Sequence, residues 1–141
     1  MLEVAVILLP YEYGLIHIIN QRSLKVKLIH YKDEEGKAYP NESAKGATGR
    51  VVIGKADGDP HFCMRVFEIE GGGYSAKHSH EYEHQVFVHS GQGEIWNGNA
   101  WQNVAAGSVL YIPGGEEHQI KSTGQDPLIF VCCIPEGAPE L

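Results

Sequence analysis

Three histidines with the spacing of a metal site stand in the segment HSHEYEHQVFV, at positions 78, 80 and 84. In an extended strand or a bent hairpin arm, residues i, i+2 and i+6 point to the same face, so these imidazoles can converge. Buried neutral imidazole needs partners for its ring nitrogens, and one divalent metal ion satisfies three imidazoles at once. The spacing therefore predicts a transition-metal site, with a surface histidine cluster as the alternative.

Short apolar runs surround the histidines and are separated by glycine and proline. They are rich in β-branched and aromatic residues and keep no helical period, so we expect strands. The runs cover residues 4–9, 15–19, 24–29, 51–53, 62–69, 85–88, 109–112 and 128–134. Asn97 and Gly98 predict a hairpin turn, whereas the polar residues 31–49 predict a loop or linker. This pattern indicates an all-β fold of the barrel or sandwich kind.

The composition is typical of one globular domain, since 43% of the 141 residues are hydrophobic and 21% are charged. The net charge of −7 argues against nucleic acid or an anionic membrane surface as a partner. No run approaches the roughly 18 apolar residues of a membrane span, and no basic residue precedes the first apolar run as in a signal peptide. Three cysteines, two of them adjacent, form no disulfide framework. We therefore expect a cytoplasmic protein.

Two segments resemble the two motifs of the cupin superfamily. Residues 72–91 match G-x5-H-x-H-x3-E-x6-G, except that His84 replaces the glutamate. Residues 107–122 match G-x5-P-x-G-x2-H-x3-N, except that Ser122 replaces the asparagine. Every other fixed position of both motifs is present, so the resemblance is specific.

The resemblance implies the architecture of the chain. We expect a cupin jelly-roll β-barrel in residues 48–141, preceded by an N-terminal extension of strands in residues 1–47. In small cupins such an extension commonly pairs with a second subunit, so we expect a homodimer that acts on a small-molecule substrate.

The histidine in place of the glutamate resembles a subgroup of small cupins that bind manganese or another metal through four histidines. It implies one divalent transition metal ion per chain, manganese, iron or zinc, held by His78, His80, His84 and His118. Gln85 is a further candidate ligand because some zinc cupins that act as polyketide cyclases use a glutamine, although its strand parity requires a bulge. The carboxylates of Glu81 and Glu83 point away from the histidines if the segment is extended.

The charge of this ligand set bears on the chemistry. Four neutral imidazoles leave a divalent ion at about +2, whereas three imidazoles and a carboxylate lower it to about +1. The higher charge makes a stronger Lewis acid and attracts anionic oxygen ligands. We expect a dioxygenase-like oxidoreductase acting on a small enolisable or aromatic compound. A non-redox polyketide cyclase or isomerase is the first alternative, and a non-catalytic binding module is the second. The sequence assigns no catalytic acid or base.

Several side chains outside the cluster have two interpretations. Arg65 is expected in a surface salt bridge, with an interior anchor for a substrate carboxylate as the alternative. Cys132 is expected to be a buried, inert thiol, with a place near the metal as the alternative. Three aromatic residues are expected in the core or at a dimer interface, or else at the pocket mouth: Trp96, Trp101 and Tyr111.

Overall fold

The structure, a computed structural model, describes residues 26–39, 42–58 and 60–141 and consists mainly of strands. The described strands are β1 (Lys37–Ala38), β2 (Lys45–Ile53), β3 (Phe62–Tyr74), β4 (His84–Ser90), β5 (Gln92–Trp96), β6 (Trp101–Ala105), β7 (Val109–Ile112), β8 (Gln119–Ser122) and β9 (Leu128–Pro135). Two single turns of 3-10 helix flank β2, namely η1 (Tyr31–Asp33) and η2 (Lys55–Asp57).

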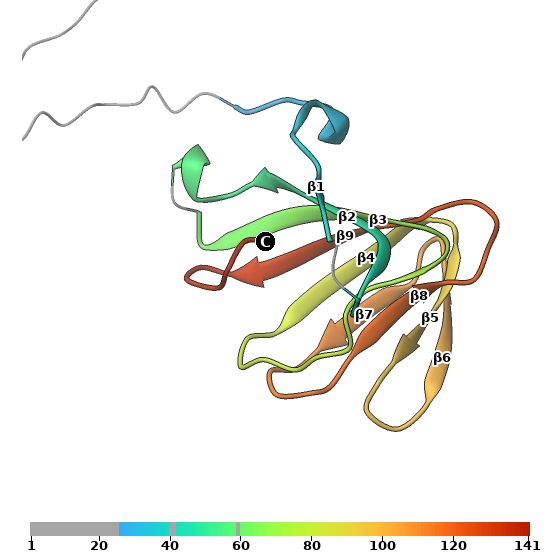
Figure 1. The fold of residues 1–141 in the computed structure, drawn as a ribbon. Coiled ribbons are helices and arrows are strands. Elements are labelled where there is room, and N and C mark those ends of the chain that lie inside the picture. The colour runs from blue at the N-terminus through green and yellow to red at the C-terminus, as the bar shows by residue number, and fades with distance from the viewer. Residues whose placement is uncertain (1–25, 40–41, 59) are drawn as a thin grey trace, which may run out of the picture.

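All described strands belong to one antiparallel sheet that curls on itself (Figure 1). Its order is β6-β5-β8-β3-β9-β4-β7, with β2 beside β3 and β1 beside β2. The sheet continues from β3 to β8 through one register pair, Tyr74 with Lys121, and bends there. The all-β prediction is confirmed, and the curvature creates an interior into which one face of each strand points.

The alternation of buried and exposed residues along β4 and β9 sets the interior face. In β9 the buried residues are Leu128, Phe130, Cys132 and Ile134, and in β4 they are His84, Val86 and Val88. Strand β3 pairs with β9 in register, with Ile69 opposite Leu128 and both side chains at 0% exposure. A histidine therefore occupies an interior position at the start of a core strand.

The hairpin predicted at Asn97 and Gly98 is confirmed. Asn97 begins the loop between β5 and β6, and its Oδ1 accepts from the backbone N–H groups of Asn99 (3.1 Å) and Ala100 (2.9 Å). The paired residues that close this loop are Trp96 and Trp101, whose ring centroids lie 5.6 Å apart.

The prediction of a loop over residues 31–49 is wrong in part, since β1 and the first half of β2 lie there. Residues 45–49 show no apolar alternation, but their backbone pairs with β3 and buries Ala47. Pairing with a distant strand overrides the local composition here.

The strand predicted over residues 24–29 is wrong for the part that the structure describes, residues 26–29. Val26 and Leu28 are 95% and 91% exposed, so no apolar face is buried. Instead Lys27 attaches the segment, because its ammonium group lies 2.8 Å from Asp57 and 3.0 Å from Glu34.

The predicted strands of residues 4–9 and 15–19 lie outside the described residues. The division at residue 48 and the homodimer stay predictions, as does the cytoplasmic location. The described sheet begins earlier than that boundary, at β1. Among the described residues, no helix is long and apolar enough to cross a membrane.

We expect Ile69→Ala to lower the free energy of unfolding by about 2–5 kcal/mol, because it removes a fully buried side chain between β3 and β9. The matched control is Val109→Ala, whose side chain is 78% exposed and whose loss should stay within about 0.5 kcal/mol. Urea unfolding followed by circular dichroism measures both. Equal effects of the two substitutions would contradict this account of the core.

Candidate metal centre

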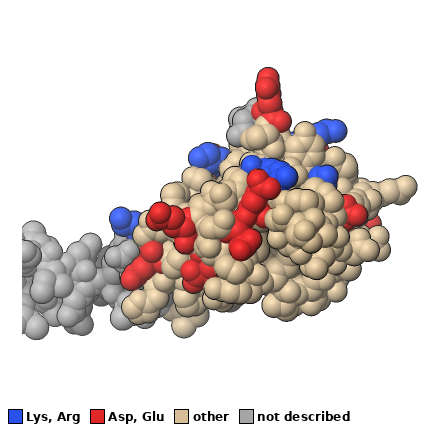
Figure 2. Space-filling view, turned by 90° about the horizontal axis from the view of Figure 1, so that it is seen from below, with Lys and Arg blue, Asp and Glu red and all other residues tan. Residues whose placement is uncertain are grey.

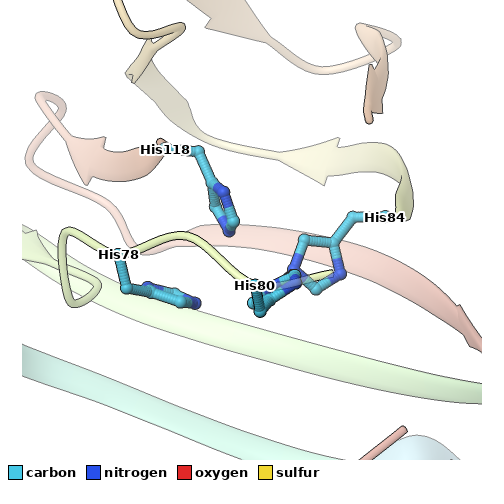
Figure 3. A group of neighbouring side chains, drawn as sticks. All are labelled: His78, His80, His84 and His118. Atoms are coloured by element: carbon cyan, nitrogen blue, oxygen red, sulfur yellow. Dashed lines mark hydrogen bonds between the residues drawn. The ribbon is translucent and has the colours of Figure 1, made fainter. Parts of the chain in front are cut away.

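Four histidine side chains point toward one another (Figure 3). One ring nitrogen from each lies within 4.8 Å of the others, and the set is His78, His80, His84 and His118. The sequence predicted this set, and the structure brings all four together. Among the described residues, no cysteine, aspartate or glutamate joins the cluster.

Two loops and one strand position the four side chains. His78 and His80 lie on the loop between β3 and β4, His84 is the first residue of β4, and His118 directly precedes β8. An isolated antiparallel bridge joins the loops, since His78 N–H donates to His118 O (3.1 Å) and His118 N–H donates to His78 O (2.9 Å).

The convergence does not arise from an extended strand over residues 78–86. Beyond the bridge at His78, the chain bends at Glu81 and Tyr82 and becomes a strand only at His84. The bend packs against the loop between β7 and β8, where Gly115 N–H donates to His80 O (2.7 Å). A side chain at Gly114 would collide with the backbone of Glu81, so this close approach requires glycine.

Two of the imidazoles are oriented by backbone carbonyls. The Nδ1 of His78 lies 2.9 Å from Ala76 O, and the Nδ1 of His118 lies 2.9 Å from Glu116 O. Since a carbonyl only accepts, each Nδ1 carries the proton, which leaves the lone pair on Nε2. Such bonds hold a metal-binding histidine in the required tautomer.

His80 and His84 face each other through Nε2 atoms 2.8 Å apart, so one donates to the other when no ion separates them. The His80 ring stacks on Tyr82, with centroids 3.7 Å apart and an angle of 9°. The Nδ1 of His80 is buried and has no hydrogen-bond partner in the described part of the chain. Four convergent imidazole nitrogens of this kind fit a divalent transition metal ion.

The other nitrogen of His84 faces the interior. Its Nδ1 lies 3.3 Å from Nη2 of Arg65 and 3.4 Å from Sγ of Cys132. A guanidinium group only donates hydrogen bonds, so the contact with Arg65 favours the His84 tautomer that has a free lone pair on Nδ1 and the proton on Nε2. The sulfur can accept, so Cys132 suits the tautomer with the proton on Nδ1, which frees Nε2 for a metal.

Burial favours the uncharged form of three of the four imidazoles. Burial lowers the pKa of His84 to about 3, with further lowering by the Arg65 charge and the other histidines. Burial is also the main cause of the lowered pKa of His118 and of His80. Neutral imidazole is the form that binds metal, so these residues need not lose a proton at neutral pH.

The cluster lines a cavity of about 230 Å³. The apolar part of its wall includes Tyr39, Phe67, Ile69, Phe130 and Leu141. No aspartate or glutamate is among the described residues that line it. The cavity is therefore an apolar chamber with imidazoles at one side.

The expectation that Arg65 forms a surface salt bridge is wrong. Its side chain is 6% exposed and lines the cavity. The sequence feature that could have indicated this position is strand parity, because Arg65 shares a strand face with Phe67 and Ile69, which also line the cavity. Cys132 is buried as expected, and burial raises the pKa of its thiol.

The remaining candidates lie elsewhere. Gln85 is exposed on the outward face of β4, between the buried His84 and Val86, so we leave it out of the proposed ligand set. Glu81 is exposed. The three aromatic residues for which a pocket mouth was the alternative do not line the histidine cavity: Trp96, Trp101 and Tyr111.

Residues 65–134 match the family model of the cupin domain. A cupin 2 domain-containing protein from Halorhodospira halophila is 31% identical, with a TM-score of 0.62 over 70% of this chain and 69% of that chain. The chain therefore belongs to the cupin family.

Two further relatives have named activities. The polyketide cyclase RemF from Streptomyces resistomycificus is 26% identical, with a TM-score of 0.72 over 79% of this chain and 80% of that chain. The 1-methylthio-D-xylulose 5-phosphate methylsulfurylase of Rhodospirillum rubrum is 32% identical over 71 residues, which are 50% of this chain. The match spans 46% of that enzyme's length.

We expect the double variant His80→Ala, His118→Ala to lose nearly all bound metal, because it removes half of the convergent nitrogens. The matched control is His61→Ala, His89→Ala, which removes two exposed imidazoles outside the cluster. Metal content per chain is measured by mass spectrometry after purification. Full occupancy in the cluster variant would overturn the proposed ligand set.

The lowered pKa of His84 predicts a pH dependence of the metal-free protein. Between about pH 3 and 6.5 the unfolded chain binds a proton at His84 that the folded chain does not. The free energy of unfolding should therefore be highest above that window and fall on acidification, with up to about 1.4 kcal/mol per pH unit from this group.

Urea unfolding at several pH values tests this prediction. His84→Gln should make the pH slope shallower, whereas His89→Gln, on the exposed face of β4, should keep the parent slope. Identical slopes for the parent and His84→Gln would contradict the prediction.

Proposed function

We propose that this cupin is an enzyme with one divalent metal ion per chain, acting on a small enolisable or aromatic compound through an oxygen atom. The observation that carries the proposal is the convergence of four imidazoles on the wall of an apolar cavity. The proposed ligands are His78, His80, His84 and His118. When bound there, the ion supplies a Lewis acid that polarises a substrate oxygen.

The residues around the cluster have separate tasks in this proposal. Backbone carbonyls at Ala76 and Glu116 orient two of the imidazoles. The apolar wall excludes water from the substrate, which strengthens electrostatic interactions at the site. Burial raises the pKa of Tyr39, a residue of the cavity wall, which favours the protonated form of its hydroxyl.

A non-redox reaction of the cyclase or isomerase type is our leading candidate. The likeness to the polyketide cyclase RemF favours it, since it extends over about four fifths of both chains. The uncharged ligand set also favours it, because four imidazoles leave the ion's charge undiminished for polarising a carbonyl.

A dioxygenase-like oxidoreductase is the second candidate. The absence of aspartate and glutamate from the described cavity wall favours it, because a reaction with dioxygen needs no carboxylate acid or base there. Protein purified without added metal distinguishes the two candidates. Zinc would favour the cyclase or isomerase, iron or manganese would favour the dioxygenase, and no bound metal would overturn the proposal.

We expect His84→Glu to retain metal and to weaken the binding of azide, because a carboxylate lowers the charge of the site by one unit. Azide is titrated against the visible absorption of the cobalt-substituted protein. The matched control His89→Glu makes the same charge change on the exposed face of β4, where solvent and salt screen it. Equal azide affinities in the parent and both variants would show that His84 is not a ligand.

A further inference from the structure

We propose that Arg65 is the carboxylate-binding residue of the cavity, and that the ligand is a small planar acid. Its carboxylate accepts hydrogen bonds from the guanidinium, and a second oxygen on the same molecule reaches the histidine cluster. The contact with the histidine cluster rests on the proposed function, whereas the contact with the guanidinium depends on Arg65 alone.

The charge of Arg65 has no counter-ion in the described structure. Its contacts are the sulfur of Cys132 (3.0 Å), Nδ1 of His84 (3.3 Å) and the backbone carbonyl of Glu140 (3.4 Å). None of these acceptors is a carboxylate. The Nε atom of Arg65 is buried and has no partner among the described residues.

Glu140 contacts Arg65 through its backbone carbonyl and not through its side chain. The carboxylate of Glu140 binds elsewhere, since its Oε1 accepts from the backbone N–H of Lys55 (2.6 Å). No ion pair of Arg65 occurs within the described ranges, which include all residues from 60 to 141. A buried charge without a counter-ion is costly to a fold unless a ligand compensates it. Carboxylate is the complementary group, because it accepts two parallel bonds from guanidinium.

The cavity wall selects a planar body for the acid. Phe67 and Phe130 stack with centroids 5.4 Å apart at an angle of 18°, and Tyr39 lies 6.2 Å from Phe67. The guanidinium carbon of Arg65 lies 5.1 Å from the Phe67 centroid, at the end of this aromatic wall. The volume of about 230 Å³ is below the roughly 300–1,000 Å³ of pockets for drug-sized ligands.

The distance between Arg65 and the histidine cluster determines how far the second oxygen of the ligand must lie from its carboxylate. The imidazole of His84 contacts the guanidinium through Nδ1 (3.3 Å) and His80 through Nε2 (2.8 Å), so about one imidazole ring separates Arg65 from this part of the cluster. An acid whose second oxygen is about one small ring away from its carboxylate can therefore reach both. Hydroxylated aromatic acids and enolic acids of similar size have this form.

The attraction for an anion is confined to the interior. The chain carries a net charge of −7, and Figure 2 shows carboxylates spread over one face of the surface. The cavity has the opposite balance, with a guanidinium and four imidazoles and no described acidic residue in its wall. Binding should therefore depend on the carboxylate and not on a general affinity for anions.

Calorimetric titration of the metal-free protein tests the Arg65 contact with benzoate and its neutral analogue benzamide. Benzoate should bind at least tenfold more tightly than benzamide, and Arg65→Gln should lower benzoate affinity at least tenfold. Arg65→Lys should retain part of the affinity, because it keeps the charge and loses the planar fork. The matched control is Arg50→Gln, whose guanidinium faces Glu68 outside the cavity (3.5 Å) and whose loss should change nothing.

Equal affinity for benzoate and benzamide, or no binding of benzoate at millimolar concentration, overturns the proposal without any variant. Unchanged affinity in folded Arg65→Gln overturns it as well. The contact with the cluster is tested separately by repeating the titration with zinc-loaded protein and the three hydroxybenzoate isomers. At least one isomer should gain affinity over benzoate. If none does, the link to the metal is wrong, whereas the Arg65 contact is judged by the metal-free titration.

Discussion

The paired backbone hydrogen bonds between His78 and His118 hold the candidate site together. They join the loop after β3 to the loop after β7, two segments far apart in the sequence. The close approach of Gly114 to Glu81 adds a second contact between the same loops. Without this junction, only His84 would be held by a strand, and the other imidazoles would have no common centre.

The interior contains imidazoles and a guanidinium group, and burying either without hydrogen-bond partners costs free energy. Uncharged imidazoles need hydrogen-bond partners, and His84 has one for each of its tautomers in Arg65 and Cys132. A guanidinium needs an acceptor, and it finds only uncharged ones among the described residues. A metal ion and an acidic ligand would satisfy both requirements, which favours a binding site over a packing defect.

The cupin barrel carries many chemistries, so the fold alone does not select one. What distinguishes this chain is the replacement of a motif carboxylate by His84, together with a cavity wall whose described residues include no acid. Both features raise the positive charge available to a substrate oxygen. They direct the proposal to anionic or enolisable compounds, and the identity of the metal separates the redox reaction from the non-redox reaction.

The sequence by itself determined the all-β class, the cupin motifs and the four histidines, because these depend on residue types at short, regular spacings. Only the tertiary structure decided that residues 45–49 form part of β2, that residues 26–29 do not form a strand, and that Arg65 points inward. Pairing with β3 decided the first, the absence of any strand partner for residues 26–29 in the described structure decided the second, and the curvature of the sheet decided which face of β3 is interior. Such long-range contacts leave no local pattern in the sequence.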